Sequence, residues 1–321
     1  MKNFTVKSSE VGERLDKIIS ARYKEFSRVA WQDQIKAGKV LVNDESADPR
    51  HIIHHNDHIK YEFPISAYNL QPTTYNLLIL DIIFENDSVL VINKPAGIIT
   101  HPAHANTTDS VVHRILAYDK SIANAVYDAD KEISRMRPGI VHRLDKNTSG
   151  VMIVAKTKDA MTHLAKQIQD KRAQKTYIAI LFGHLEQDDL TVHNWLNRDI
   201  NDRRKVAITT PDSGREAETF FHIVSLLTNH KGDKITLVEA KPITGRTHQI
   251  RVHAAHLGHP VLGDSMYYTH ESKLLSERLG IKRQLLHAKT LSIRLPKEAN
   301  RTTFDANIPN DILNILKDFK G

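Results

Sequence analysis

Hydrophobic positions near the N-terminus follow a helical period. Within residues 11–26, the apolar positions that share one helical face are Val11, Leu15, Ile18, Ile19, Tyr23 and Phe26. A second short helix is predicted after Ser27, a good N-cap residue, and it would end before Gly38. The stretches KVLVND and HIKYEF then predict two paired strands, the first closed by an Asn-Asp turn. Residues 1–63 are therefore expected to form a small helix-helix-hairpin domain.

The rest of the chain predicts a second, larger domain. Residues 64–76 contain two prolines and mostly polar side chains, which is typical of a linker. From residue 77 to residue 321, the pattern predicts a hairpin that turns at residues 85–87, strands at 151–157, 175–185 and 233–243, and helices at 158–173 and 248–258. The face of the first of these helices that should be buried carries Met161, Leu164, Ala165 and Ile168. Strands and helices do not alternate regularly, so the fold class is expected to be α+β.

Composition narrows the class of protein. The chain has 321 residues, of which 40% are hydrophobic and 26% charged, and it contains no cysteine. Disulfides, thiolate zinc sites and cysteine nucleophiles are thereby excluded, and a reducing compartment is favoured. No apolar run approaches the roughly 18 residues of a membrane span, and the N-terminus lacks the apolar stretch of a signal peptide. We therefore expect a cytoplasmic protein, a monomer, without a membrane partner.

Positive charge is concentrated in part of the larger domain. The formal net charge is +7, yet residues 1–63 carry 11 Lys and Arg against 10 Asp and Glu. Residues 141–183 carry 8 against 3, and residues 273–297 carry 7 against 1. Such local excess is the expected electrostatic footprint of a phosphate-binding surface.

One carboxylate stands among bases in the stretch HRLDK. Asp145 follows Arg143 by two residues and directly precedes Lys146. An aspartate is ordinarily ionised at neutral pH, and a carboxylate held near bases can act as a nucleophile or a proton acceptor. Spacing alone favours a turn-capping Asp in a polar loop over a catalytic one, and both interpretations stay open at this point.

The longer stretch HRLDKNTSG, residues 142–150, resembles the signature loop of the RluA-type pseudouridine synthases. Four further stretches resemble motifs of that family in the same order, at 91–102, 175–180, 242–264 and 284–288. The resemblance covers about residues 77–297. The N-terminal domain resembles the alpha-L RNA-binding domain often fused to these enzymes. The implied fold is a mixed, mostly antiparallel central sheet flanked by helices, preceded by this small domain.

The resemblance implies an isomerisation of uridine within RNA. The C1′–N1 bond breaks, the uracil turns, and a C1′–C5 bond forms, without a cofactor or a metal. Asp145 matches the essential Asp of the family, which either attacks the sugar or takes a proton from it. Tyr177 matches the aromatic residue beside the base, and Arg251 the basic residue that pairs with the Asp, an arrangement expected to be bidentate. Arg246 is the rival for this pairing.

The remaining candidate site residues are expected to bind substrate. By the resemblance, Arg143 fills the space left when the target base is flipped out of its stack; the alternative is a salt bridge to a neighbouring carboxylate. His142 is expected to hold the loop, Leu286 to pack against the site, and Gln249 to contribute from the basic motif.

Two other chemistries were considered. His248, His253, His256 and His259 could suggest zinc, but the family motif explains this stretch without a metal. A glycoside hydrolase would need a second carboxylate paired with Asp145, and no matching one was expected in the basic motifs.

The expected partner is RNA, with large-subunit ribosomal RNA as the first choice of substrate. Transfer RNA is the alternative substrate. The alternative function is an RNA-binding or ribosome-assembly protein that has lost catalysis. The presence of Asp145, Tyr177 and Arg251 favours the enzyme, since a binding protein would be free to lose them.

Overall fold

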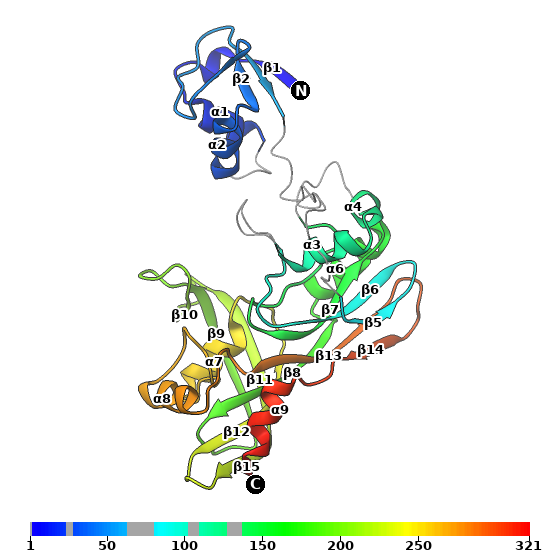
Figure 1. The fold of residues 1–321 in the computed structure, drawn as a ribbon, viewed down its shortest axis with the longest axis vertical. Coiled ribbons are helices and arrows are strands. Elements are labelled where there is room, and N and C mark those ends of the chain that lie inside the picture. Colours follow the sequence, from blue (N-terminus) through cyan, green and yellow to red (C-terminus); the bar gives the residue numbers. More distant parts are fainter. Residues whose placement is uncertain (1, 24–27, 63–79, 102–108, 127–136) are drawn as a thin grey trace. The chain divides into compact units, whose positions relative to one another are not determined.

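The computed structural model describes residues 2–23, 28–62, 80–101, 109–126 and 137–321. These parts of the chain belong to two compact units, shown in Figure 1. The smaller unit contains the N-terminal residues up to 62, and the larger contains residues 80–100, 114–126 and 139–321. The expected linker, residues 64–76, lies outside the described residues.

The smaller unit combines two helices with a four-stranded antiparallel sheet. Its elements are β1 (Lys2–Thr5), the 3-10 helix η1 (Ser8–Glu10), α1 (Leu15–Arg22), α2 (Arg28–Lys36), β2 (Val40–Val42), β3 (Glu45–Ser46) and β4 (His58–Tyr61). The strand order is β1-β4-β2-β3. The predicted pairing of β2 with β4 is confirmed. Asn43 and Asp44 both have positive φ angles, of 52° and 70°, as a tight turn between β2 and β3 requires.

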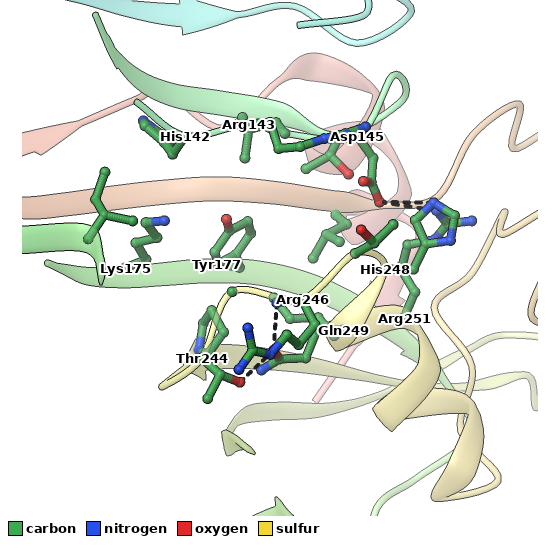
Figure 2. A pocket seen from close by; sticks show the side chains of 18 of the residues that line it. His142, Arg143, Asp145, Lys175, Tyr177, Thr244, Arg246, His248, Gln249 and Arg251 are labelled. Carbon is green, nitrogen blue, oxygen red and sulfur yellow. Dashed lines mark hydrogen bonds and ion pairs between the residues drawn. The ribbon is translucent and has the colours of Figure 1, made fainter. Parts of the chain in front are cut away.

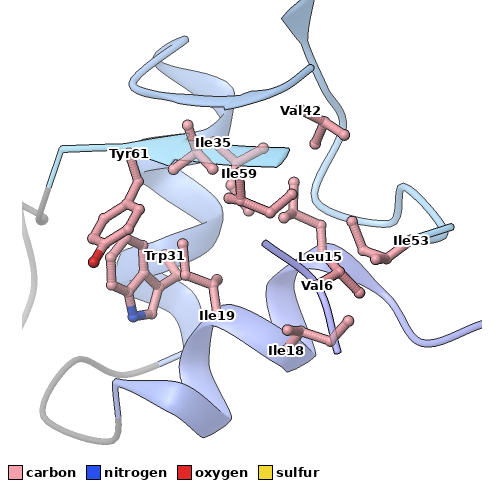
Figure 3. Close-up of a cluster of buried hydrophobic side chains, with 11 residues drawn as sticks. Val6, Leu15, Ile18, Ile19, Trp31, Ile35, Val42, Ile53, Ile59 and Tyr61 are labelled. Atoms are coloured by element: carbon pink, nitrogen blue, oxygen red, sulfur yellow. The ribbon is translucent and has the colours of Figure 1, made fainter. Parts of the chain in front are cut away.

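The core of the smaller unit explains where its first helix begins. Leu15 and Ile19 are fully buried in one cluster with Trp31, and Figure 3 shows Ile19 beside Trp31 and Leu15 near Ile53. Val11, which was expected on the same face, precedes the helix and is 41% exposed. Periodicity identified the buried stripe but placed the start of the helix one turn too early.

The larger unit is built on one long sheet. Its elements are β5 (Ile82–Glu85), β6 (Val89–Lys94), α3 (Val111–Tyr118), α4 (Ser121–Ala125), β7 (Ser149–Ala155), α6 (Lys158–Gln169), β8 (Gln174–Phe182), β9 (Asp189–Arg198), β10 (Val206–Thr209), β11 (Arg215–Asn229), β12 (Lys234–Pro242), α7 (Gln249–His256), α8 (His270–Arg278), β13 (Leu286–Arg294), β14 (Arg301–Asp305), α9 (Asn310–Lys317) and β15 (Phe319–Lys320). The order is β10-β9-β11-β12-β8-β13-β7-β6-β5, with β14 beside β13 and β15 beside β11. Among the described residues, no helix is long and apolar enough to cross a membrane.

The sheet is mixed and mostly antiparallel, as expected. The exception is the parallel pairing of β13 with β7, where His287 lies opposite Ser149. This pairing sets the loop that leads into β7 beside β8, the next strand on the other side of β13. The sheet topology thus brings stretches far apart in sequence to one place.

The helix α6 packs partly through the predicted face, because Leu164 is buried and Met161 and Ile168 are half-buried. Ala160, Leu164 and Gln167 are its buried residues, whereas Ala165 is exposed. Gln167 is buried because its amide donates to the carbonyl of Arg294 at 2.7 Å and accepts from the amide of the same residue at 3.0 Å. A hydrophobic pattern could not indicate this, since the buried contact is polar.

Gly150, at the start of β7, sits where no side chain fits. A Cβ atom there would lie 2.2 Å from the carbonyl oxygen of Ala288, and the φ angle is +121°. We expect Gly150→Ala to lower the free energy of unfolding by about 2–4 kcal/mol, because the β7–β13 backbones must separate. In Gly232→Ala, at φ +82° with no atom within 4 Å, only the backbone strain of about 1 kcal/mol should appear. Denaturant unfolding measures both, and equal losses would contradict the argument.

Candidate active site

The backbone of the loop around Asp145 is held by a buried lysine. Lys94, at the end of β6, is fully buried. Its ammonium group donates to the carbonyl oxygens of Pro95 at 2.8 Å, Lys146 at 3.1 Å and Thr148 at 2.9 Å. Burial lowers the pKa of Lys94 to about 7, while the charge of Asp145 acts in the opposite direction. All three donors of the ammonium are used, and two of them fix the residues that follow Asp145.

Two more side chains complete this support. Arg283 donates to the carbonyl of Asn147 at 3.1 Å and is itself held by Asp311, at 2.6 and 2.9 Å. The hydroxyl of Thr100 donates to the carbonyl of Leu144 at 2.9 Å. Since backbone atoms on both sides of Asp145 are fixed, the direction of its carboxylate is set by the fold.

A chain of charges runs from the interior to Asp145. Arg251, on α7, donates from Nε and Nη2 to both oxygens of Asp264, at 2.5 and 2.8 Å. Its remaining Nη1 donates to Oδ2 of Asp145 at 3.1 Å, an interaction drawn in Figure 2. Burial alone would lower the pKa of Arg251, but Asp264, and then Asp145, raise it. The bidentate pairing expected between Arg251 and Asp145 is therefore wrong: the bidentate partner is Asp264.

Asp264 also corrects the expectation that no second carboxylate falls in the basic motifs. It is the last residue of the motif at 242–264, and its side chain has no exposed surface. Besides Arg251, it accepts hydrogen bonds from the backbone amides of Met266 and Tyr267, at 2.8 and 3.1 Å. A carboxylate so enclosed cannot reach a substrate, whereas the side chain of Asp145 is 20% exposed. The arrangement therefore does not form a glycosidase pair.

His248 is a second neighbour of the Asp145 carboxylate, beside Arg251. Nε2 of His248 lies 3.8 Å from Oδ2 of Asp145, and its Nδ1 is 2.9 Å from the hydroxyl of Tyr267. That hydroxyl accepts from the amide of Val206, so its own proton can point to Nδ1. Burial lowers the pKa of His248, against the pull of Asp145. A neutral ring with its proton on Nε2, facing Asp145, satisfies all these contacts.

The predicted site residues converge on one cavity of about 270 Å³. All eight line it: Asp145, Tyr177, Arg251, Arg143, His142, Arg246, Gln249 and Leu286. Most of them are labelled in Figure 2, where Tyr177 lies between Lys175 and Asp145. Burial, and then the charge of Asp145, raise the pKa of Tyr177, so its phenol stays protonated at neutral pH.

Gln249 uses every polar group of its side chain within the protein, whereas His142 uses one of its two ring nitrogens. The amide of Gln249 accepts from Thr244 and Arg246 and donates to Glu218 and Thr219, which uses its full capacity. Gln249 therefore fixes the turn that carries Arg246 and offers substrate no free amide group. His142 accepts from the amide of Ile153 at 3.0 Å, which agrees with its expected part in holding the loop.

The two arginines at the mouth of the cavity differ in their contacts. Arg246 donates from Nε to the carbonyl of Glu216 at 2.8 Å and does not pair with Asp145. Arg143 is exposed, and within the described parts of the chain it has no hydrogen-bond or ion-pair partner. The alternative interpretation of Arg143, a structural salt bridge, thus finds no support there.

The histidines that suggested zinc point to different partners. His253 lies 3.0 Å from the side-chain oxygen of Asn194, and His259 lies 2.8 Å from the carbonyl of Phe182. In the described parts of the chain, no group of three or more His, Asp or Glu side chains could hold a metal ion.

The most important residues that sequence reasoning missed are Asp264, Lys94 and Lys175. Asp264 and Lys94 fall inside stretches recognised as motifs, and Lys175 is two residues before Tyr177. Their positions in the motifs could have marked them. Their partners, in contrast, are set by tertiary contacts that no spacing reveals.

The chain matches two protein-family models and several known proteins. Residues 88–256 match the family model described as RNA pseudouridylate synthase, and residues 13–59 match that of the S4 domain. An uncharacterised RNA pseudouridine synthase of Bacillus subtilis is 32% identical over 99% of this chain and 98% of its own length. Ribosomal large subunit pseudouridine synthase D of Xanthomonas campestris is 33% identical over 98% of this chain and 92% of its own.

A solved structure shows the same fold. The human RNA pseudouridylate synthase domain-containing protein 4 superposes with a TM-score of 0.56 at 22% identity, and the match covers 75% of this chain and 94% of that one. The sequence match extends through the loop of Asp145 and the helix of Arg251. This chain therefore belongs to the RNA pseudouridylate synthase family.

Proposed function

We propose that this chain acts as a cytoplasmic monomer that isomerises specific uridines of large-subunit ribosomal RNA to pseudouridine. Relatives named ribosomal large subunit pseudouridine synthase D, which align with nearly the whole chain, support this substrate. The S4 domain supports RNA as the partner.

The observation that carries the mechanism is the half-occupied carboxylate of Asp145. Its Oδ2 is bound by Arg251, while its Oδ1 has no hydrogen-bond partner among the described residues. Oδ1 is thus free to attack C1′ of the ribose or to accept a proton from the sugar. In both routes the C1′–N1 bond breaks with its electron pair on the uracil. When C5 then bonds to C1′, either the Oδ1–C1′ bond breaks or the sugar takes its proton back from Asp145. C5 finally loses its proton while N1 gains one.

The walls of the cavity suit a flipped base. The ring of Tyr177 provides a flat surface on which a uracil can stack. Leu286, which is buried on β13, adds an apolar contact. Arg246 can meet a phosphate at the mouth, since only its Nε is bound to the protein.

Arg143 is assigned the space that the target base leaves in the RNA. A stacked uridine can reach Asp145 only after it is flipped out, at a cost of a few kcal/mol. An exposed guanidinium without a protein partner can stack on the neighbouring bases and meet their phosphates.

The first test concerns the reaction and its substrate. In a strain that lacks the gene, we expect pseudouridine to be lost at particular positions of large-subunit ribosomal RNA. The wild-type gene should restore them and Asp145→Asn should not, because the amide can neither attack nor accept a proton. In vitro, Asp145→Asn should release tritium from 5-tritiated uridine RNA at least about 10³-fold more slowly, with RNA binding retained. Losses confined to transfer RNA would refute the proposed substrate, and full restoration by Asp145→Asn would refute the role of this residue.

The second test concerns base flipping. We expect Arg143→Ala to reduce single-turnover isomerisation more for a uridine in a structured stem-loop, by about tenfold or more, than for the same uridine in an unstructured oligomer. The stacked target loses the side chain that fills the gap, whereas the unstacked one has little stacking to lose. Lys146→Ala, which removes another exposed cation of the same loop, should affect both substrates alike. Equal fractional losses for Arg143→Ala would make it a general phosphate contact.

A further inference from the structure

The end of the cavity away from Asp145 contains two hydrogen-bond donors without a partner. Nε2 of His142 accepts the amide proton of Ile153, so the proton of the neutral ring lies on Nδ1. Nδ1 is buried and makes no hydrogen bond in the described structure. Burial, and then the charge of Lys175, keep the pKa of His142 well below its usual value, so the ring is neutral. His142 therefore presents an unused N–H group.

The second donor is the ammonium group of Lys175. It lines the same cavity, and among the described residues it has neither a hydrogen-bond acceptor nor a carboxylate partner. Burial lowers the pKa of Lys175 to about 8. An N–H buried without an acceptor costs stability, and the half-buried cation beside it has no counter-charge among the described residues. A ligand that supplies acceptors to both groups would therefore be bound favourably.

In Figure 2, the order of the side chains places Tyr177 between these donors and Asp145. Lys175 and Tyr177 are two residues apart on β8, so both side chains leave the same face of the sheet, about 6.6 Å apart along the strand. Figure 2 shows Tyr177 between Lys175 and Asp145. A uracil stacked on Tyr177 with its sugar at Asp145 would direct its far edge toward Lys175 and His142.

That edge carries carbonyl oxygens both before and after the reaction. In uracil, N1 and C5 flank C6, while the carbonyls of O2 and O4 flank N3. A half-turn about the N3–C6 axis brings C5 to the place of N1, as the isomerisation requires, and it also exchanges O2 with O4. Donors fixed in the protein would therefore meet a carbonyl oxygen at the same position in both orientations.

The detached base would need these donors most. When the C1′–N1 bond breaks, its electron pair stays on the uracil, and the negative charge spreads from N1 to O2 and O4. A cation and an N–H group held at these oxygens bind the anion more strongly than the neutral base, which lowers the barrier.

We propose that Lys175, assisted by the Nδ1–H group of His142, binds the carbonyl edge of the target uracil and stabilises the uracil anion while it turns. This inference rests on the proposed function and adds Lys175 to the catalytic residues. It gives a reason for a half-buried cation that no carboxylate of the described residues neutralises.

The test compares activity with stability. Lys175→Met keeps the length of the side chain and removes the charge. We expect it to slow single-turnover tritium release at saturating enzyme by about 10²-fold or more, with RNA affinity changed less than threefold. Its thermal unfolding temperature should equal or exceed that of the wild type, because a half-buried charge without a counter-charge is removed. Lys166→Met, at an exposed position of α6, should match the wild type in both respects.

The pH profile gives an independent readout. Lys175 is charged below its pKa and neutral above it, so wild-type activity should fall as the pH rises through about 8. Lys175→Arg keeps the charge at every pH, so its activity, though lower, should lack this fall.

Each outcome decides between explanations. Activity of Lys175→Met within threefold of the wild type would overturn the inference, and so would a loss that follows unfolding or RNA affinity alone. An unchanged alkaline fall in Lys175→Arg would also overturn it. These failures differ from failure of the proposed function, in which the wild type itself would release no tritium from any ribosomal RNA.

Discussion

The guanidinium group of Arg251 connects the interior of the larger unit to the carboxylate of Asp145. A guanidinium this deeply buried must be neutralised, and Asp264 does so with two hydrogen bonds while backbone amides hold Asp264 in turn. Only one donor group is left for Asp145, which sits at the open end of this chain of charges. These ionic contacts thus orient Asp145 and leave its Oδ1 without a hydrogen-bond partner among the described residues.

The loop of Asp145 is held through its backbone, so the side chains of the loop stay available. Lys94, Thr100 and Arg283 bind carbonyl oxygens on both sides of Asp145, the first two from the stretch at 91–102 and the third from near the C-terminal end of the chain. Two of these supports are buried cations. Their charge favours an anion in the loop, and their many donors make the loop rigid. A loop made rigid by these hydrogen bonds can keep its geometry when the target nucleotide is flipped out of the RNA.

The sequence was sufficient to predict which residues line the cavity, but not which hydrogen bonds and ion pairs each of them makes. All eight candidate residues line one cavity, because the sheet topology gathers the loops and strands that carry the motifs, together with α7, at one place. The bidentate partner of Arg251, the committed amide of Gln249 and the polar face of α6 were not predictable. Each of these depends on a tertiary hydrogen bond, which leaves no trace in periodicity or composition.

We infer that Asp264, Arg251 and Asp145 act together: Asp264 holds Arg251, and Arg251 orients Asp145. A double-mutant cycle of single-turnover isomerisation tests it most directly, with Asp264→Asn, Arg251→Met and the double variant, each checked for folding. If Asp264 acts only through Arg251, the double variant should be no slower than Arg251→Met alone, within about threefold. Losses that multiply in the double variant would mean that the two residues act independently, and the charge chain would not be what positions Asp145.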